Sequence, residues 1–188
     1  FPEAAEFYQK LGTRAIYVGH PLLDMCQIQN KTAESKQILA VYTGSRKQEH
    51  KHLIPLFIDT IRAFEKKHKL NVIFAAVNKA HADTLKAAFP SDVQWDIELN
   101  QNRELMQKAD LALTASGTAT LELALHQVPF VAAYRLNPIS AWVIWHTVGK
   151  RYLEKTGYIA LPNIIMKKEV SPEFLQGKAT VEQLIQGL

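Results

Sequence analysis

The chain lacks several features that would place it in well-defined classes of protein. Its 188 residues include one cysteine, Cys26, so an internal disulfide is excluded. Its longest apolar run, Ile139 to Val148, is interrupted by His146 and is far shorter than the ~20 residues that a membrane-spanning helix needs. The seven histidines show no metal-ligand spacing: His50 and His52 are two positions apart and would point in different directions on a helix. We therefore expect no disulfide scaffold, no membrane-spanning helix and no metal site.

The excess of charge of one sign is also small. Lys and Arg outnumber Asp and Glu by 22 to 18, which gives a formal net charge of +4. The lysines are scattered, and no basic stripe with interleaved aromatic residues is present, so we expect no nucleic-acid partner. The mild positive bias instead favours anionic ligands or an anionic membrane surface.

The composition that remains is that of an ordinary globular domain. Hydrophobic residues make up 47% of the chain and charged residues 21%, and the length suits one domain with a sizeable core. Residues Phe1 to Tyr8 resemble a strand end that runs into a helix, and residues 179 to 188 form a short helical pattern that simply stops. We expect the chain to be a fragment at both ends.

From residue 38 onward, short apolar runs alternate with amphipathic helical patterns. Strands are predicted at residues 38–42, 72–76, 93–97, 111–113 and 130–133. Helices are predicted at residues 47–68, 79–89, 103–108 and 118–126, with Pro55 kinking or restarting the first of them. This repeated β-α order predicts an α/β fold with a parallel, doubly wound sheet covered on both faces. In such sheets, ligands bind beyond the carboxyl ends of the strands.

The segment before residue 37 has a different character. A strand is predicted at Arg14 to Val18, followed by a turn at Gly19-His20-Pro21. Residues 25 to 36 are mostly polar and are interpreted as a linker into the main domain.

The strongest functional signal is the small-residue turn within residues 114–122. Ser116, Gly117 and Thr118 lie between a predicted strand and a predicted helix, so backbone N–H groups are left free at the helix N-terminus. Those N–H groups and the helix dipole both favour an anion. Glu122 adds a carboxylate one turn after Thr118 on the same helix face. Phosphate on the helix end and ribose hydroxyls on the acid would suit a nucleotide.

Ser116 does not fit the alternative of a hydrolase nucleophile. A nucleophile elbow needs glycine two residues before and two residues after the serine. Thr114 and Thr118 occupy these two places, so the motif fails on both sides. Ser116 and Thr118 are better interpreted as hydrogen-bonding or capping residues at the helix start.

A second turn, Thr43 to Arg46, follows the first core strand. Gly44 permits an unusual backbone angle or a close ligand approach, and the planar guanidinium of Arg46 suits phosphate oxygens. The turn, which includes Ser45, matches neither a Walker A loop nor a dinucleotide fingerprint. Alone it could be a tight turn with a solvated arginine. Together with the turn at 114–122 on the same sheet edge, it predicts a pyrophosphate site that needs no metal.

Further candidates lie near the C-terminal end. Tyr134-Arg135 ends the last predicted strand, and Leu161-Pro162-Asn163 is predicted to form a later turn at the same edge, where Asn163 alone would be an ordinary turn residue. Between them, residues 138–151 contain Trp142 and Trp145 and end in basic residues. This pattern fits an interfacial helix on a membrane, and equally a helix buried in the core or against a partner domain.

Five motifs in this order resemble the lipid-A-disaccharide synthase family, and the resemblance covers the whole chain. The motifs are Gly19-His20-Pro21, Gly44-Ser45-Arg46, Ala115-Ser116-Gly117-Thr118 with Glu122, Tyr134-Arg135 and Leu161-Pro162-Asn163. Each is weak alone, but five in order with similar spacing are specific. Two departures are a Tyr42-Thr43 pair where the family usually has Leu-Pro, and a longer stretch at residues 139–155.

The resemblance implies the C-terminal, donor-binding half of a GT-B glycosyltransferase of family 19, in which two Rossmann-like domains face each other across a cleft. Residues 1–37 would then be the end of the N-terminal domain and a linker. Residues 38–188 would be a Rossmann-like nucleotide-sugar-binding domain, truncated at its C-terminus. The N-terminal domain of the same protein would be a partner and is absent here. Because that domain would carry the catalytic base, this polypeptide alone is expected to be inactive.

The reaction implied by the resemblance is an inverting transfer of 2,3-diacylglucosamine from UDP-2,3-diacylglucosamine to 2,3-diacylglucosamine 1-phosphate, known as lipid X. The product is the β-1,6 disaccharide of lipid A, and UDP is released. The resemblance implies no metal or other cofactor besides the UDP-sugar donor. It also implies a cytoplasmic protein at the periphery of the inner membrane of Gram-negative bacteria.

The resemblance also assigns roles to particular residues. Arg46 and Asn163 would be catalytic residues. The nucleotide would be bound by Gly44, Ser45, Arg46, Ser116, Gly117, Thr118, Glu122, Tyr134 and Arg135.

Two alternatives remain open from the sequence. One is another GT-B enzyme that uses a UDP-sugar, of the UDP-GlcNAc epimerase or peptidoglycan GlcNAc transferase type, although those families carry different glycine patterns at the corresponding turn. The other is a nucleotide-binding domain without catalytic activity, against which Arg46, Glu122 and Asn163 together argue.

Overall fold

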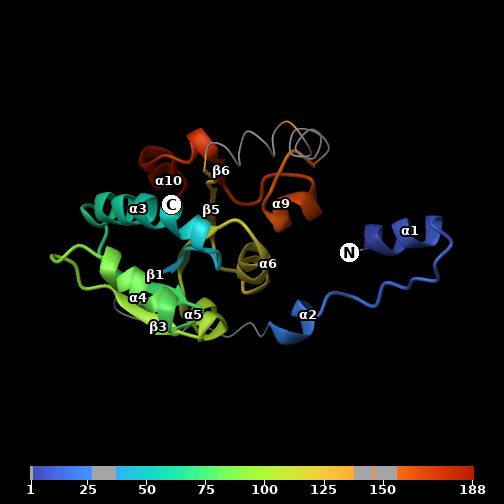
Figure 1. The fold of residues 1–188 in the computed structure, drawn as a ribbon, viewed down its shortest axis with the longest axis horizontal. Coiled ribbons are helices and arrows are strands. Elements are labelled where there is room, and N and C mark those ends of the chain that lie inside the picture. The colour runs from blue at the N-terminus through green and yellow to red at the C-terminus, as the bar shows by residue number, and fades with distance from the viewer. Residues whose placement is uncertain (1, 27–36, 138–145, 147–155) are drawn as a thin grey trace.

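The computed structural model describes residues 2–26, 37–137, 146 and 156–188. Its centre is one parallel sheet with the strand order β3-β2-β1-β4-β5-β6 (Figure 1). The strands are β1 (Gln37–Tyr42), β2 (Leu70–Ala76), β3 (Asp96–Leu99), β4 (Leu111–Ala115), β5 (Phe130–Tyr134) and β6 (Glu173–Leu175). The helices are α1 (Pro2–Lys10), α2 (Leu22–Met25), α3 (Lys47–Glu65), α4 (Lys79–Ala88), α5 (Asn102–Lys108), α6 (Thr118–Leu125), α9 (Leu161–Met166), the 3-10 helix η2 (Gln176–Lys178) and α10 (Val181–Gly187).

The strand order shows how the sheet is wound. The chain starts in the centre at β1, builds outward to β3, then crosses back to place β4 beside β1 and builds outward again to β6. All five neighbouring pairs are parallel. The predicted doubly wound sheet is therefore confirmed, and its direction of winding reverses between β1 and β4.

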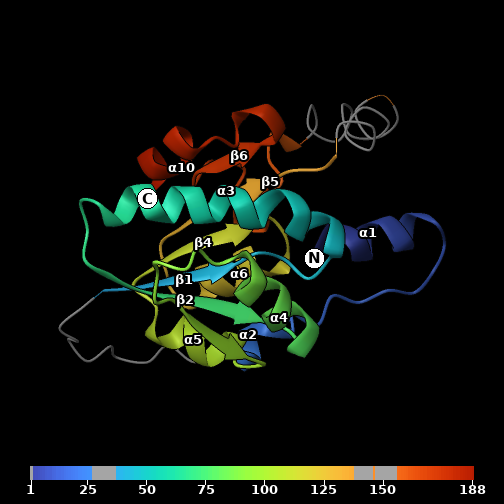
Figure 2. The same cartoon turned by 60° about the vertical axis from the view of Figure 1, so that its left-hand side comes forward.

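The central strands are apolar along their length because helices cover both faces of the sheet. In β1, Leu39 and Val41 face a core formed with α3, α4 and α10, whereas Ile38 and Ala40 face a second core formed with α5 and α6. Figure 2 shows α3 lying across the sheet with α10 beside it. Each large side chain that is fully buried, such as Phe57 on α3, stabilises the fold by about 1.5–3 kcal/mol relative to leaving it exposed.

The first long helix is continuous, so of the two expectations for Pro55, a kink or a restart, the restart is wrong. Helix α3 runs from Lys47 to Glu65 with Pro55 inside it and on its exposed side. The proline removes one backbone hydrogen bond. The apolar face of the helix on either side, with Leu53 and Phe57 completely buried, is sufficient to keep one helix on the sheet.

Two predicted strands differ from the structure. Residues 13–20 belong to no helix or strand, so the strand at Arg14 to Val18 is wrong; Ile16 and Val18 are 72% and 92% exposed and have no sheet to cover them. The strand predicted at 93–97 begins only at Asp96, because Trp95 instead packs against Phe74 and Phe89. The three-residue strand β6 was not predicted, since three residues are too few to show a period.

The N-terminal segment is distinct from the sheet domain. Both views show α1 lying away from the sheet, joined to α2 by an extended stretch (Figures 1 and 2). Eight large apolar residues of this segment are exposed: Phe7, Tyr8, Leu11, Ile16, Tyr17, Val18, Leu23 and Met25. Helix α2 lies close to the sheet domain, where the Arg103 guanidinium donates to the Met25 sulfur at 3.6 Å.

The described part of the chain contains no helix that is long and apolar enough to span a bilayer. The helix predicted at residues 138–151, with Trp142 and Trp145, lies outside the described residues except for position 146.

Candidate functional site

A cavity of about 370 Å³ lies at the carboxyl edge of the sheet, between the ends of β1 and β4. The turn Thr43 to Arg46 after β1 and the turn Ser116 to Thr118 after β4 both line it. The remaining lining residues are Tyr42, Glu49, Ala75, Val77, Asn102, Met106, Thr114, Ala115, Ala119 and Glu122. The two turns that the sequence singled out separately therefore meet at one place, where the winding of the sheet reverses and ligands bind in such folds.

Gly44 fits this place for two physical reasons. Its φ is 86°, in the region that side chains with a Cβ rarely adopt. A Cβ at this position would also lie 2.1 Å from Glu49 Oε2 and 3.3 Å from the Cβ of Ala115. The sequence interpretation of Gly44 as a residue with an unusual backbone angle is confirmed.

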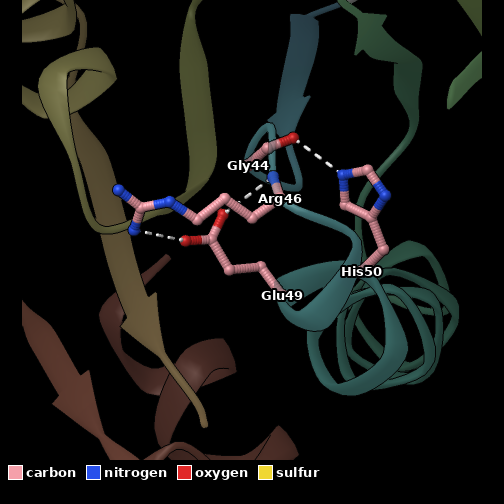
Figure 3. A network of polar contacts seen from close by, with 4 residues as sticks. All are labelled: Gly44, Arg46, Glu49 and His50. Carbon is pink, nitrogen blue, oxygen red and sulfur yellow. Dashed lines mark hydrogen bonds and ion pairs between the residues drawn. The ribbon is translucent and has the colours of Figure 1, made fainter.

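Arg46 stands at the start of α3 and is tied to the helix by Glu49 (Figure 3). The Glu49 carboxylate accepts from the Arg46 backbone N–H at 3.4 Å and lies 3.4 Å from the guanidinium. The Glu49 side chain is 8% exposed and the Arg46 side chain 78%. The guanidinium is mostly in solvent, so it can turn to a phosphate, while the buried Glu49 carboxylate keeps its hydrogen bond from the Arg46 backbone N–H.

Glu49 was not identified from the sequence. The available signal was an acid three residues after the residue that precedes a helix, which is the acidic half of a capping box. Its carboxylate lines the same cavity as Arg46. Glu49 therefore keeps the Arg46 side chain at the cavity when no anionic ligand is bound there.

The turn after β4 presents the N-terminus of α6 to the cavity. Gly117 precedes the helix, and no side chain caps the first turn. The Ser116 hydroxyl oxygen is buried at the cavity and has no hydrogen-bond partner among the described residues. A buried polar atom left in this way costs about 1–3 kcal/mol, so a ligand that supplies an acceptor or donor here is favoured.

Glu122 has the partner that its partly buried position required. Its side chain is 19% exposed, and its Oε2 lies 3.7 Å from Arg103 Nε on α5. Tyr42 donates to the backbone carbonyl of Asn102 at 3.2 Å, in the same wall of the cavity. Burial, followed by the carboxylates of Glu98 and Glu122, raises the pKa of Tyr42 well above its ordinary value. Tyr42 is therefore a neutral donor at any physiological pH.

Tyr134 and Arg135 do not line the cavity. Tyr134 ends β5, and its pKa is raised by burial and then by the Glu49 carboxylate, while Arg46 lowers it, so its hydroxyl lies within electrostatic reach of that ion pair. Arg135 faces η2, where its Nε donates to the Gln176 carbonyl at 3.5 Å.

Asn163 lies in a helix and not in the predicted turn, so that prediction is wrong. It belongs to the first turn of α9, which begins with Leu161 and Pro162, and proline is favoured at this position because its missing N–H has no helical partner anyway. The side chain is fully buried. Its amide donates to the Ser171 carbonyl at 2.9 Å and to Glu173 at 3.3 Å. Its oxygen accepts from the backbone N–H groups of Val170 and Ser171 at 2.8 and 3.1 Å.

The cavity can therefore bind an anion with a polar group attached. The exposed Arg46 guanidinium, the N-terminus of α6, the buried Ser116 hydroxyl and the Glu122 carboxylate all line it. No group of three or more His, Cys, Asp or Glu side chains that could hold a metal ion occurs among the described residues.

A doubly wound parallel sheet with a cavity at its point of reversal defines a Rossmann-like α/β domain. The family profile described as "Lipid-A-disaccharide synthetase" matches residues 1–187, and the chain belongs to this family. The resemblance and the fold class expected from the sequence are both confirmed.

Individual relatives agree with this assignment. The chain is 35% identical over 185 residues to the lipid-A-disaccharide synthase of Rickettsia conorii, covering 93% of this chain and 40% of the relative. It is 33% identical over 201 residues to lipid-A-disaccharide synthase 2 of Legionella pneumophila strain Lens, covering 100% and 51%. For the Colwellia psychrerythraea synthase the figures are 32% over 198 residues, 98% and 49%. The chain thus spans about half, or less, of the length of these relatives.

Proposed function

We propose that this chain is the donor-binding part of a glycosyltransferase that forms the lipid A disaccharide. The observation that carries the proposal is the meeting of Gly44-Ser45-Arg46, Ser116-Gly117-Thr118 and Glu122 at one cavity, in a chain of the lipid-A-disaccharide synthetase family. The donor is UDP-2,3-diacylglucosamine and the acceptor is 2,3-diacylglucosamine 1-phosphate, lipid X.

In this proposal UDP lies across the cavity. Its pyrophosphate takes the Arg46 guanidinium, the N–H groups at the start of α6 and the Ser116 hydroxyl. Its ribose hydroxyls donate to the Glu122 carboxylate. The charge-assisted contact of Arg46 with phosphate is worth about 1.5–3 kcal/mol, and the exposed guanidinium is free to turn toward it. No metal is needed because the arginine and the helix end offset the phosphate charge.

The reaction is an inverting displacement. The bond between the donor sugar C1 and the β-phosphate oxygen breaks as a bond forms between C1 and the 6-hydroxyl oxygen of the acceptor. The hydroxyl proton passes to a base that we expect outside this chain, and UDP leaves with the electron pair. Arg46 and the α6 N-terminus act as catalytic groups by stabilising the charge that develops on UDP.

Tyr134, Arg135 and Asn163 have indirect roles in this proposal. The hydroxyl of Tyr134 is within electrostatic reach of the Arg46–Glu49 pair, and Arg135 anchors η2 after β6. Asn163 supports activity by holding the segment from Val170 to Glu173, which leads into β6 at the edge of the sheet.

The domain division belongs to the same proposal. Residues 1–37 are the end of the N-terminal domain and a linker, and residues 38–188 belong to the nucleotide-sugar-binding domain. The separation of α1 from the sheet and the exposed apolar residues of this segment support a partner surface on an N-terminal domain. We further propose a cytoplasmic protein at the surface of the inner membrane, and an inactive polypeptide when the N-terminal domain is missing.

Titration with nucleotides tests the donor site. We expect UDP to bind and ADP or GDP to bind much more weakly. Arg46→Ala should weaken UDP binding by about 1.5–3 kcal/mol, because a charge-assisted hydrogen bond is lost. Arg62→Ala is the matched control, since Arg62 lies on the same helix but pairs with Asp92. Equal UDP affinity in the Arg46 and Arg62 variants would show that Arg46 does not bind UDP.

A further inference from the structure

Two histidines form a stacked pair against the turn that follows β1. His50 on α3 and His81 on α4 are both buried, and their ring centroids are 4.0 Å apart with planes 10° from parallel. His50 Nε2 lies 3.0 Å from the Gly44 carbonyl oxygen (Figure 3). His81 Nε2 lies 2.9 Å from the Thr43 hydroxyl oxygen. Each ring therefore contacts one residue of the turn.

The partners fix which nitrogen of each ring carries a proton. The Gly44 carbonyl can only accept, so His50 Nε2 is the donor. The backbone N–H of Val77 points at His81 Nδ1 at 3.4 Å, so that nitrogen accepts and His81 Nε2 donates to Thr43. Burial, and then the neighbouring His50 ring, lowers the pKa of His81 to about 4, which keeps this ring neutral.

The pair acts on the turn from outside the cavity. Thr43 and Gly44 line the cavity, whereas His50 and His81 do not. The Thr43 side chain is fully buried. Gly44 has a positive φ, and because glycine can adopt many other backbone angles, this conformation must be held by neighbouring groups. The two ring donors therefore hold the turn from outside this cavity.

We propose that His50 and His81 are positioning residues for the phosphate-binding turn, which they hold so that Arg46 and the turn backbone face the pyrophosphate. This inference rests on the proposed function, because it concerns the same UDP site. Without the ring donors, the Gly44 carbonyl and the Thr43 hydroxyl lose their partners and the turn loses its fixed shape. The effect falls on phosphate binding and not on the rest of the nucleotide.

Substitutions that keep ring shape separate the hydrogen bonds from the packing. His50→Phe and His81→Phe retain flat stacked rings without donors, and His50→Gln and His81→Gln restore an N–H donor near the Nε2 position. Thr43→Val removes the acceptor of His81 without altering either ring. His52→Phe is the matched control on α3, since His52 does not contact the turn. Dissociation constants for UDP and for uridine are measured by equilibrium titration of each protein.

We expect each Phe variant and Thr43→Val to weaken UDP binding about three- to tenfold, the loss of one hydrogen bond, with uridine binding changed less than about twofold. The Gln variants should regain most of the UDP affinity, and His52→Phe should leave it unaltered. If the unaltered protein does not bind UDP, the proposed function fails and this inference fails with it. If the unaltered protein binds UDP but the Phe and Val variants bind it equally well, or lose UDP and uridine alike, the positioning role alone is overturned.

Discussion

At the scale of single residues, the site depends on contacts that a few atoms decide. Arg46 and Glu49 illustrate this, because the carboxylate that holds the arginine is buried while the guanidinium is in solvent. Because the guanidinium is exposed, a phosphate in the cavity can replace Glu49 as its partner, and Glu49 retains the backbone N–H of Arg46. Without a ligand, Glu49 therefore keeps Arg46 beside the cavity, and the guanidinium stays available to a phosphate.

Gly44→Ala should damage both stability and UDP binding. The positive φ costs an alanine about 1–2 kcal/mol, and the new Cβ would displace the Glu49 carboxylate that holds Arg46. We expect an unfolding free energy lower by about 1–3 kcal/mol in urea titrations, and UDP affinity at least about tenfold lower.

Gly157→Ala provides the matched control for this change. Gly157 also has a positive φ, of 72°, but a Cβ there would meet no atom within 4 Å. Gly157→Ala should lower the unfolding free energy because of the backbone angle, but it should not lower the affinity for UDP. Equal UDP affinity in both alanine variants would contradict the role assigned to the close approach of Glu49.

At the scale of elements, local signals in the sequence account for what could be predicted. The apolar runs predicted four of the six strands, and the small residues at 114–118 predicted the turn before α6. A strand at Arg14 to Val18 was wrong because side-chain preference for strands does not supply a neighbouring strand. His50 and His81 were missed as site residues because their contacts depend on how α3 and α4 pack, whereas Glu49 carried a local capping-box signal that was overlooked.

Helix α9 shows how one buried side chain can hold two elements together away from the cavity. Asn163 satisfies four hydrogen-bonding groups between Val170 and Glu173, and Glu173 also accepts from the N–H groups of Ile159 and Ala160 at 2.9 and 2.6 Å. The start of α9 and the approach to β6 are thereby joined. The sequence could not indicate this, since the partners follow Asn163 by 7–10 positions in irregular chain.

Asn163→Ala should therefore act on stability. Removing the amide leaves the buried backbone N–H and carbonyl of Ser171 without partners and also removes the hydrogen bond of the Val170 N–H, so we expect a loss of about 2–4 kcal/mol in the unfolding free energy. UDP affinity should change less than about twofold. Ser171→Ala is the matched control, because Asn163 contacts only the backbone of Ser171. A large loss of UDP affinity with unaltered stability would instead place Asn163 in direct contact with the nucleotide.

At the scale of the whole molecule, the sheet brings together groups that lie far apart in the sequence. The two turns of the cavity are separated by about 70 residues and become neighbours only because β4 pairs with β1. The repeated β-α order could predict that both turns lie at one edge of the sheet, since the carboxyl ends of parallel strands lie at the same edge. The charges and hydrogen bonds that complete the cavity follow from helix packing, which the order of elements does not define.

Stability of the whole fold should fall below neutral pH because of one buried ring. His81 has a pKa of about 4 in the folded protein and about 6.5 when unfolded, so the unfolded chain binds more protons between these values. The contribution of the neutral His81 ring to the unfolding free energy is complete above pH 6.5 and is lost progressively as the pH falls toward 4. Urea titrations should show a loss of about 1–2 kcal/mol from His81 between pH 7 and pH 5. His81→Gln, which cannot titrate, should show a correspondingly smaller fall, and equal falls in both proteins would contradict a neutral, buried His81.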